Sequence, residues 1–301
     1  MPKTSYLRTL MKIAYITYSG AVKYAAANGF NENTDLLPFL KNKGLDIESI
    51  IWDDPSVDWQ QFDIALLKTP WDYHQKFEAF STWLDKLESL NIRLLNDYAT
   101  VRWNMDKHYL QEIAAAGFDM IHSIFLDKGW NGDLNDLFEN LDAEDIIIKP
   151  CISGGSKNTI AINITNAEQT RPGIIDLLSK GDYIAQPLMP EIRQGEWSHI
   201  FFDGNHSHSI IKKPKQGDFR VQQIYGGTIE PLHPTKEQIA HARSYLEKFA
   251  PDTLYARVDG LMVNNKFMLM ELELIEPFLY LSYDENAVEN YYQALSQRLQ
   301  S

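Results

Sequence analysis

Two neighbouring segments near the carboxyl end decide the fold. They read Tyr255-Ala-Arg-Val-Asp-Gly260 and Met268-Leu-Met-Glu-Leu-Glu-Leu-Ile-Glu-Pro277. Both are rich in strand-forming residues, and the second alternates leucines with acids, which is typical of a strand with one face in the core. Between them, Asn264-Asn-Lys266 is typical of a hairpin loop. We therefore expect an antiparallel hairpin in which Val263 pairs with Phe267.

This register brings acidic side chains together on one face of the hairpin. Asp259 falls opposite Glu271 and Arg257 opposite Glu273, and directly opposed residues lie roughly 5 Å apart at Cβ. Three carboxylates at this spacing, with one arginine, repel one another unless a cation lies among them. Oxygen ligands of this kind suit Mg²⁺, which takes one or two carboxylates and completes its shell with water and phosphate oxygens. The alternative is a solvent-facing acidic strand, but the alternating leucines indicate that the other face is core.

The composition is that of a globular protein and excludes several classes. The 301 residues carry a formal charge of −13, and 44% of them are hydrophobic. No apolar run approaches the roughly 20 residues that a membrane span needs, and an acidic chain without a basic run is a poor candidate for binding nucleic acid. Residues 1–10 resemble an appendage rather than a signal peptide. With Cys151 as the one cysteine, internal disulfides are excluded, and a cytoplasmic location is the default expectation.

The amino-terminal part alternates strands and helices. We expect strands at residues 12–18, 46–52, 62–68 and 92–95, and helices at residues 36–42 and 76–90. This alternation predicts a small parallel α/β unit over residues 11–98. Ligands gather at the carboxyl ends of the strands in such units. The loop Lys68-Thr-Pro-Trp-Asp-Tyr-His74 follows the third strand, and it either docks a substrate or anchors two units.

A second informative stretch combines a buried strand, a lysine and a loop of small residues. The strand Ile146-Ile-Ile-Lys149-Pro150 leads to Ser153-Gly-Gly-Ser156. Glycine and serine let backbone amides approach an anion closely, and a lysine beside them adds a point charge for phosphate. The P-loop motif is absent, since no Gly-Lys-Ser/Thr opens a helix. Because an unpaired charge at the end of an apolar strand is costly, Lys149 is expected to have a functional partner.

The remaining segments complete the order of elements. A helix is expected at residues 101–116, and it carries Lys107. A strand that begins at residue 182 runs into a proline-punctuated hinge that ends at residue 192. Further expected elements are a hairpin of residues 197–203 and 208–213, an Asp218-Phe-Arg220 segment followed by two glycines, and helices at residues 236–249 and 287–299.

The order of these pieces resembles the ATP-grasp superfamily over about residues 11–300. Within it, the chain is most similar to the glutathione synthetase-like and ribosomal-protein glutamate-ligase-like branch, with motifs similar to those of D-cycloserine synthetase-like ligases. The resemblance implies an α/β and α+β architecture. It comprises an amino-terminal parallel α/β domain (residues 11–98), a subdomain with the phosphate-binding loop (99–185) and a carboxyl-terminal subdomain with the metal site (186–301).

The resemblance implies that ATP binding is spread over several motifs. Lys107 and Lys149 match the two lysines that reach the nucleotide phosphates, although a surface helix lysine is the alternative for Lys107. A mobile loop covers the phosphates, the backbone of a hinge meets adenine, and Glu191 is a candidate for the ribose hydroxyls. The residues implied for the loop and the hinge are Ser153, Gly154, Gly155, Ser156, Gln186, Pro187, Leu188 and Met189.

The resemblance also implies the residues of the reacting centre. Arg220 matches the arginine that steadies the transferred phosphate, although a simple ion pair with Asp218 is the alternative. Asp259, Glu271 and Glu273 match the ligands of Mg²⁺, which Mn²⁺ can replace. Relatives often carry Asn at the third position and Arg near the position of Ser198, so substrate contacts can differ there. Candidates for the acceptor pocket are Trp71, Asp72, Tyr73, Arg193 and Tyr225.

These assignments imply an ATP-dependent carboxylate–amine ligase. Transfer of the γ-phosphoryl group to a carboxylate gives an acyl phosphate, and an amine or a related nucleophile such as a thiol displaces phosphate to form an amide. The chemistry needs positioning and charge neutralisation by Lys149, Arg220 and the metal, so no covalent role for Cys151 is expected. Small carboxylates and amines would be the partners of such a ligase. Relatives are often homo-oligomers. A small-molecule kinase on the same fold and a catalytically silent nucleotide-binding protein are the alternatives.

Overall fold

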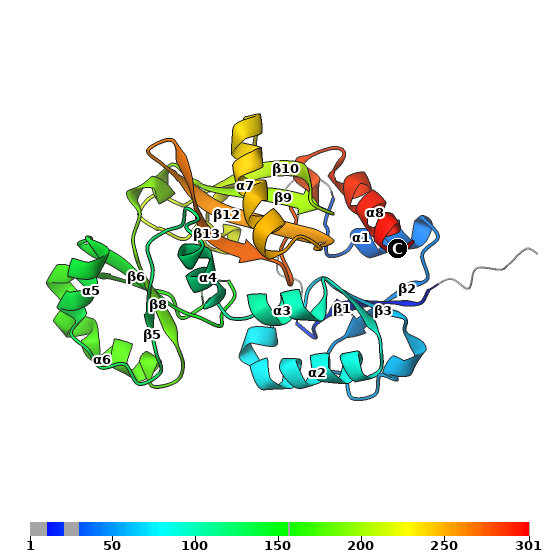
Figure 1. Ribbon diagram of the computed structural model, residues 1–301, viewed down its shortest axis with the longest axis horizontal. Coiled ribbons are helices and arrows are strands. Elements are labelled where there is room, and N and C mark those ends of the chain that lie inside the picture. Colours follow the sequence, from blue (N-terminus) through cyan, green and yellow to red (C-terminus); the bar gives the residue numbers. More distant parts are fainter. Residues whose placement is uncertain (1–10, 21–29, 156, 301) are drawn as a thin grey trace, which may run out of the picture.

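Three sheets organise the computed structural model, which describes residues 11–20, 30–155 and 157–300 (Figure 1). The expected appendage of residues 1–10 and Ser156 of the expected phosphate loop lie outside these ranges. In Figure 1 the amino-terminal sheet and the carboxyl-terminal sheet lie one above the other, and the middle sheet forms a lobe to their left. The α/β and α+β architecture expected from the sequence is therefore confirmed.

The amino-terminal domain is the parallel unit that the alternation of elements predicts. Its strands run in the order β2-β1-β3-β4, and every pair is parallel. Helix α2 packs on one face of the sheet and helix α1 on the other. The elements are β1 (Ile13–Thr17), α1 (Leu36–Asn42), β2 (Ile47–Ile51), β3 (Ile64–Leu67), α2 (Phe77–Ser89) and β4 (Arg93–Leu95).

The middle lobe is an antiparallel sheet with helices on one face. Its strand order is β5-β8-β6-β7, and the connection between β6 and β7 carries the small-residue loop. Helices α5 and α6 bury their apolar residues against it. The sequence analysis did not anticipate β7 or α6. The elements are β5 (Ile124–Leu126), α5 (Leu134–Leu141), β6 (Asp145–Pro150), β7 (Ile160–Asn163), α6 (Ala167–Leu178) and β8 (Tyr183–Pro187).

The carboxyl-terminal sheet has the order β11-β10-β9-β12-β13 and is antiparallel. Helices α4 and α7 pack on one of its faces. Helix α8 lies between this sheet and the amino-terminal sheet, with residues of both in one core. The elements are α4 (Tyr109–Ala115), β9 (Glu196–Phe202), β10 (Asn205–Lys213), β11 (Thr228–Leu232), α7 (Lys236–Phe249), β12 (Tyr255–Val263), β13 (Lys266–Glu273) and α8 (Ala287–Arg298).

The single helix expected at residues 101–116 is wrong. The structure has α3 (Tyr98–Asn104) and then α4, with a turn between them that carries Lys107. Asp106 accepts a hydrogen bond from the backbone N–H of His108 (3.0 Å), and the backbone N–H of Lys107 donates to Cys151 (3.0 Å). These bonds replace the helical ladder at the break. Lys107 is thereby fixed beside the end of β6 rather than on a helix surface.

The expected hairpin loop is one residue too long and the expected pairing of Val263 with Phe267 is wrong, whereas the expected pairings of Asp259 and Arg257 are correct. The turn consists of Asn264 and Asn265, both with positive φ (51° and 64°), and Val263 pairs with Lys266. A two-residue turn of this kind favours asparagine. The shift of one residue is cancelled by a β-bulge between Asp259 and Gly260. As a result, Asp259 lies opposite Glu271 and Arg257 opposite Glu273.

Candidate functional site

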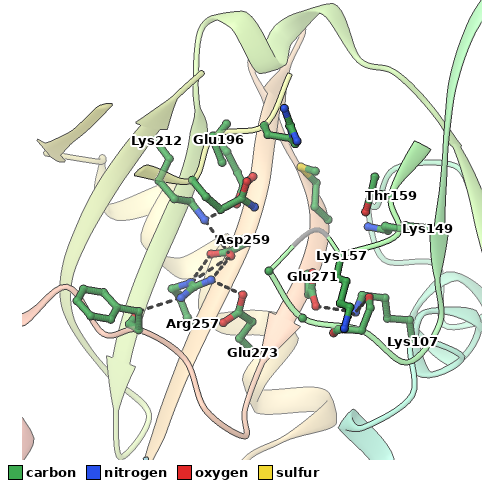
Figure 2. A pocket seen from close by; sticks show the side chains of 18 of the residues that line it. Lys107, Lys149, Lys157, Thr159, Glu196, Lys212, Arg257, Asp259, Glu271 and Glu273 are labelled. Atoms are coloured by element: carbon green, nitrogen blue, oxygen red, sulfur yellow. Dashed lines mark hydrogen bonds and ion pairs between the residues drawn. The ribbon is translucent and has the colours of Figure 1, made fainter. Parts of the chain in front are cut away.

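A cavity of about 770 Å³ lies where the three sheets meet (Figure 2). Its volume is within the range of about 300–1,000 Å³ that is usual for small-molecule sites. Apolar residues of β12, β13 and the hinge line one part of it, and charged residues line the rest. The charged lining residues are Lys107, Lys149, Lys157, Glu196, Lys212, Arg220, Arg257, Asp259, Glu271, Glu273 and Glu276.

Strand β13 is held at the edge of its sheet by two side chains. Asn104 donates to the carbonyl of Leu272 (2.9 Å) and accepts from the N–H of Leu274 (3.0 Å). The hydroxyl of Tyr109 accepts from the N–H of Leu272 (2.8 Å). These bonds satisfy backbone groups that an edge strand otherwise leaves open. With the leucines packed inward, Glu271 and Glu273 face the cavity.

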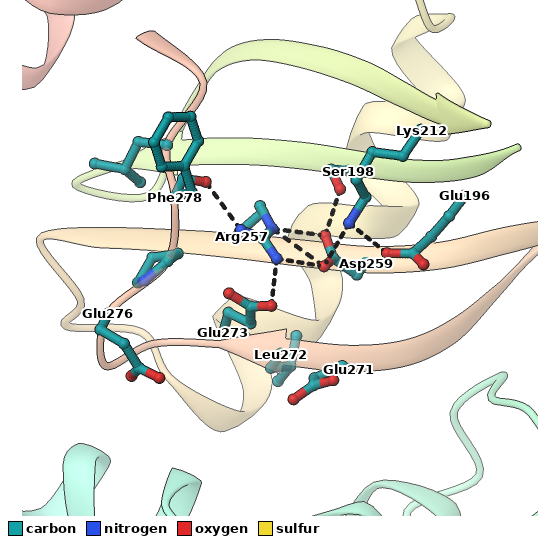
Figure 3. Close-up of polar contacts among 12 residues, drawn as sticks. Glu196, Ser198, Lys212, Arg257, Asp259, Glu271, Leu272, Glu273, Glu276 and Phe278 are labelled. Atoms are coloured by element: carbon teal, nitrogen blue, oxygen red, sulfur yellow. Dashed lines mark hydrogen bonds and ion pairs between the residues drawn. The ribbon is translucent and has the colours of Figure 1, made fainter. Parts of the chain in front are cut away.

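Each acid of the hairpin has a cationic partner in the protein, Glu271 in Figure 2 and Asp259 and Glu273 in Figure 3. Lys107 Nζ lies 3.0 Å from Glu271, and Arg257 forms an ion pair with Glu273. Asp259 is 3% exposed and is contacted by Arg257 (2.9 Å), by Lys212 (3.2 Å) and by the hydroxyl of Ser198 (2.6 Å). The repulsion expected among these acids is thus relieved by side-chain cations.

The acids do not converge on one point. The described residues that place three ligand atoms within 4.8 Å of one another are Asp106, His108 and Cys151, and the acids of the hairpin are not among them. Glu271 and Glu273 each have 31% of the side chain exposed, whereas Asp259 has 4%. Glu271 and Glu273 are therefore the more accessible oxygen donors.

The surroundings of the three acids shift their pKa values in different directions. Burial alone would raise the pKa of Asp259, but Arg257 and Lys212 outweigh it and hold that pKa well below its usual range. Burial, together with the neighbouring Asp259 and Glu271, raises the pKa of Glu273 to about 7 despite Arg257. Burial opposes ionisation of Glu271 too, but Lys107 and Lys149 lower its pKa. Glu273 is therefore the acid whose negative charge is least compensated.

Two lysines, Lys107 and Lys149, face the cavity at the small-residue loop. Lys149 makes no hydrogen bond or ion pair with any residue that the structure describes, and burial lowers its pKa, an effect that the charge of Lys107 increases. Lys107 Nζ lies 3.3 Å from the carbonyl of Ser153. Ser153, Gly154 and Gly155 line the cavity as expected. An anion placed here would meet two lysines at once.

The expected hinge forms an apolar wall of the cavity. Pro187, Leu188 and Met189 line it, and the amide of Gln186 donates to Ser123 (2.8 Å). Glu191 is not among the lining residues, although its Oε2 atom is buried and has no hydrogen-bond partner among the described residues. A flat apolar ring would find a matching surface along this wall.

Arg220 forms the ion pair with Asp218 that was the alternative to a role at the phosphate, and it also borders the cavity. Its guanidinium makes two hydrogen bonds to Asp218 (3.0 and 2.7 Å) and lies 3.8 Å from the ring centre of Tyr225. The ion pair and the stacking orient the side chain, and they do not remove it from the cavity.

Cys151 is unsuited to nucleophilic chemistry. The thiol is 1% exposed, and burial with the nearby charges of Asp106 and Asp182 raises its pKa to about 12. A thiol with this pKa is almost entirely protonated at neutral pH. This agrees with the expectation that the reaction needs no covalent intermediate on the chain.

Sequence analysis missed several charged groups of the cavity. It gave no role to Lys212, Glu196 or Glu276, all of which line the cavity. Lys212 is 4% exposed and directly follows Ile210 and Ile211 in β10. A lysine after apolar strand residues is the same signal that identified Lys149. Of the acceptor-pocket candidates, Trp71 and Tyr73 line the cavity, whereas Asp72, Arg193 and Tyr225 do not.

Known proteins share this architecture. A family model described as the N-terminal domain of D-cycloserine synthetase DcsG matches residues 13–96. The cycloserine biosynthesis protein DcsG of Streptomyces lavendulae is 27% identical over 278 residues, which cover 88% of this chain and 92% of that protein. A glutathione synthetase of Agrobacterium fabrum is 22% identical over 187 residues, which cover 60% of this chain and 55% of that protein.

Solved structures of ligases are similar in fold to this chain. The crystal structure of D-cycloserine synthetase DcsG superposes with a TM-score of 0.81 at 25% identity, over 95% of this chain and 99% of that one. A D-alanine–D-alanine ligase of Bacillus anthracis, crystallised with ATP, superposes with a TM-score of 0.66 at 16% identity, over 96% of each chain. The second likeness bears on the fold alone. Within the described residues, no helix has the length and apolar character of a membrane span.

Proposed function

The chain is an ATP-grasp ligase of the glutathione synthetase-like branch, and we propose that its cavity joins a small carboxylic acid to an amine by way of an acyl phosphate. The observation that carries the site assignment is the arrangement of charge in one cavity. Lys107 and Lys149 stand at the small-residue loop, and the acids of the hairpin lie beside them. The phosphates of ATP need cationic groups around them, and the metal bound to those phosphates needs carboxylate ligands next to the cations.

We assign the nucleotide to the loop and the hinge. Lys107, Lys149 and the backbone of residues 153–155 would bind the phosphates, while Leu188 and Met189 would pack against adenine. The backbone N–H of Leu188 is already bonded to Asp145 (2.9 Å), so this residue would offer its carbonyl oxygen. Glu191, with its unpartnered Oε2, is the candidate for the ribose hydroxyls.

The residues present fit a divalent cation in their chemistry. Carboxylate oxygens are the ligands that Mg²⁺ and Mn²⁺ prefer, and Glu273 has its pKa raised to about 7 by burial and by neighbouring acids. Glu271 and Glu273 would hold the metal from their exposed positions, and Asp259 would complete the set. When bound, the metal would neutralise charge on the transferred phosphoryl group.

The chain's own cations support the chemistry of both steps. A carboxylate is a poor electrophile. When one of its oxygens attacks the γ-phosphorus, the bond from that phosphorus to the bridging oxygen breaks, ADP leaves, and the attacking oxygen becomes part of a good leaving group. Lys149, Lys212 and Arg220 would offset the charge that develops on the phosphoryl oxygens. The amine then attacks the acyl carbon, the bond to the phosphate oxygen breaks, and phosphate leaves. The use of ATP also favours a cytoplasmic location.

Product analysis tests this function. Mg-ATP is incubated with pooled amino acids and small carboxylic acids, and ADP, AMP and free phosphate are quantified together. We expect ADP and phosphate in equal amounts, dependent on the pool. ADP without free phosphate would indicate a kinase, and AMP would overturn the acyl phosphate. The similarity to a D-cycloserine synthetase supports a small substrate, so the pool begins with small amino acids.

A further inference from the structure

Glu276 is the one acid of the cavity that lacks a cationic partner among the described residues. Glu196, Asp259, Glu271 and Glu273 each form an ion pair with a lysine or arginine. Glu276 follows β13 and lines the same cavity, yet its carboxylate makes no hydrogen bond or ion pair with any described residue. Figure 3 draws the ion pairs around Arg257, and none reaches Glu276.

The backbone around Glu276 is fixed on both sides. Trp71 donates from its indole nitrogen to the carbonyl of Glu276 (3.0 Å). The buried Lys68 donates to the carbonyl of Pro277 (3.4 Å) and pairs with Glu32 (2.7 Å), which in turn accepts from the N–H of Leu279 (2.8 Å). The backbone that carries Glu276 is therefore held at this wall by the amino-terminal domain.

The surroundings of Glu276 disfavour an uncompensated negative charge. Burial raises its pKa well above the usual range, and Glu273 adds to the effect. Aromatic rings line the same wall, since Tyr18 and Trp71 have ring centres 6.0 Å apart and both border the cavity. Aromatic rings that border the cavity can attract an organic cation in addition to the carboxylate.

The unpaired charges of the cavity have opposite signs at two places. Lys149 and Lys157 have no carboxylate partner among the described residues, and both belong to the phosphate-loop side. Glu276 belongs to the segment after β13, against the amino-terminal domain. The triphosphate would satisfy the lysines, which leaves a cationic substrate group as the partner of Glu276.

We propose that Glu276 binds the ammonium group of an amino-acid substrate of this ligase. The inference rests on the ligase function, which requires a carboxylic acid and an amine, and an amino acid carries both groups. It assigns a specificity-determining role to Glu276. A 2-hydroxy acid of the same size replaces the ammonium group by a neutral hydroxyl, so the site should reject it.

The test compares two matched pools in the presence of a non-hydrolysable ATP analogue and Mg²⁺. One pool contains small D- and L-amino acids, and the other contains the corresponding 2-hydroxy acids. Binding is read as the shift of the thermal unfolding midpoint, and the binding member of the pool is then titrated calorimetrically. We expect wild-type protein to bind the amino acids alone. Glu276→Gln should weaken that binding about thirtyfold or more, because a desolvated charge pair is lost.

Two variants separate charge from structural effects. Glu276→Asp keeps the charge on a shorter side chain and should retain part of the affinity. Glu230→Gln removes an exposed carboxylate outside the cavity, which is paired with Lys213, and should leave binding unchanged. Affinity for the ATP analogue should be the same in all variants, which shows that the site is intact.

The outcomes distinguish this inference from the ligase assignment. Equal binding of hydroxy acids and amino acids by wild-type protein would overturn it, and so would an unchanged preference in Glu276→Gln. Binding of the ATP analogue with no response to either pool would also overturn it while leaving the nucleotide site standing. A protein that binds no ATP analogue would contradict the proposed function itself.

Discussion

Lys107 Nζ lies 3.0 Å from Glu271 and joins the turn after α3 to the acidic strand. One side of this ion pair faces the phosphate loop and the other belongs to the set of acids assigned to the metal. Lys107 is 6% exposed, whereas 31% of the Glu271 side chain is exposed, so the lysine end of the pair is buried and the carboxylate end reaches the cavity. The pair thus links the two halves of the proposed ATP site before any ligand binds.

Replacing Glu271 by Gln should abolish metal-dependent turnover and preserve the fold. The substitution removes an oxygen charge needed for the metal, and the loss of one such electrostatic group commonly costs about 10²–10³ in kcat. The measurement is phosphate release at saturating Mg-ATP, with the thermal midpoint recorded in parallel. Glu112→Gln, an exposed residue of α4, is the matched control. Full activity in Glu271→Gln would remove this residue from the metal site.

Replacing Lys68 by Met should destabilise the protein strongly. Lys68 and Glu32 are each 1% exposed, and removing one partner leaves the other charge buried and unpaired, which costs about 3–5 kcal/mol. Urea unfolding measures the difference. Lys180→Met breaks the exposed pair with Asp176 and should change the free energy of unfolding by less than about 1 kcal/mol. Similar values for the two variants would show that the buried pair does not anchor the domains.

Replacing Gly260 by Ala should destabilise the hairpin. A Cβ at this position would lie 2.4 Å from the carbonyl oxygen of Met268, so the bulge that aligns Asp259 with Glu271 would have to shift. We expect a loss of about 1–3 kcal/mol together with reduced metal-dependent turnover. Gly173→Ala in α6 meets no atom within 4 Å and should stabilise by about 0.5–1 kcal/mol. An active and stable Gly260→Ala variant would contradict the role of the bulge.

Acidification should reduce stability through His199. Burial, with a contribution from His206, lowers the pKa of His199 from 6.5 to about 3. Below pH 6.5 the unfolded chain binds a proton that the folded protein excludes, so the free energy of unfolding falls by about 1.4 kcal/mol per pH unit between pH 6.5 and 3. Unfolding curves at pH 7 and 5 should therefore differ by about 2 kcal/mol from this group.

The variants identify the histidine responsible. His199→Gln should flatten the pH dependence of stability, whereas His233→Gln at an exposed position should not. The measurement is the slope of the free energy of unfolding against pH. Identical slopes in wild-type protein and His199→Gln would show that His199 is protonated in the folded state as readily as in the unfolded chain.

Much of this architecture is encoded in local patterns. The alternating strands and helices predict the parallel sheet, and helices α1 and α7 have the bounds that the sequence indicates. A lysine at the end of an apolar strand identified Lys149, because an uncompensated charge there is costly. The acidic hairpin was found because side chains of a strand alternate between faces.

The remaining features depend on contacts between distant segments. The break at Lys107 is set by a bond to Cys151, which no local helix pattern reveals. Lys212 pairs with Glu196 across a ladder that contains a bulge between His206 and His208, so a regular register would misplace it. In the hairpin, by contrast, the predicted turn was one residue too long, but a bulge at Gly260 offsets that difference, so the acids lie opposite the residues that the sequence predicted.

Transfer of an oxygen isotope tests the central claim, the acyl phosphate, most directly. The acid substrate found in the pool is labelled with ¹⁸O in its carboxylate, and the products are examined by mass spectrometry. The account predicts one ¹⁸O atom in each phosphate released, because the carboxylate oxygen that attacks the γ-phosphorus leaves with it. Unlabelled phosphate, or ¹⁸O in AMP, would contradict the mechanism proposed for this cavity.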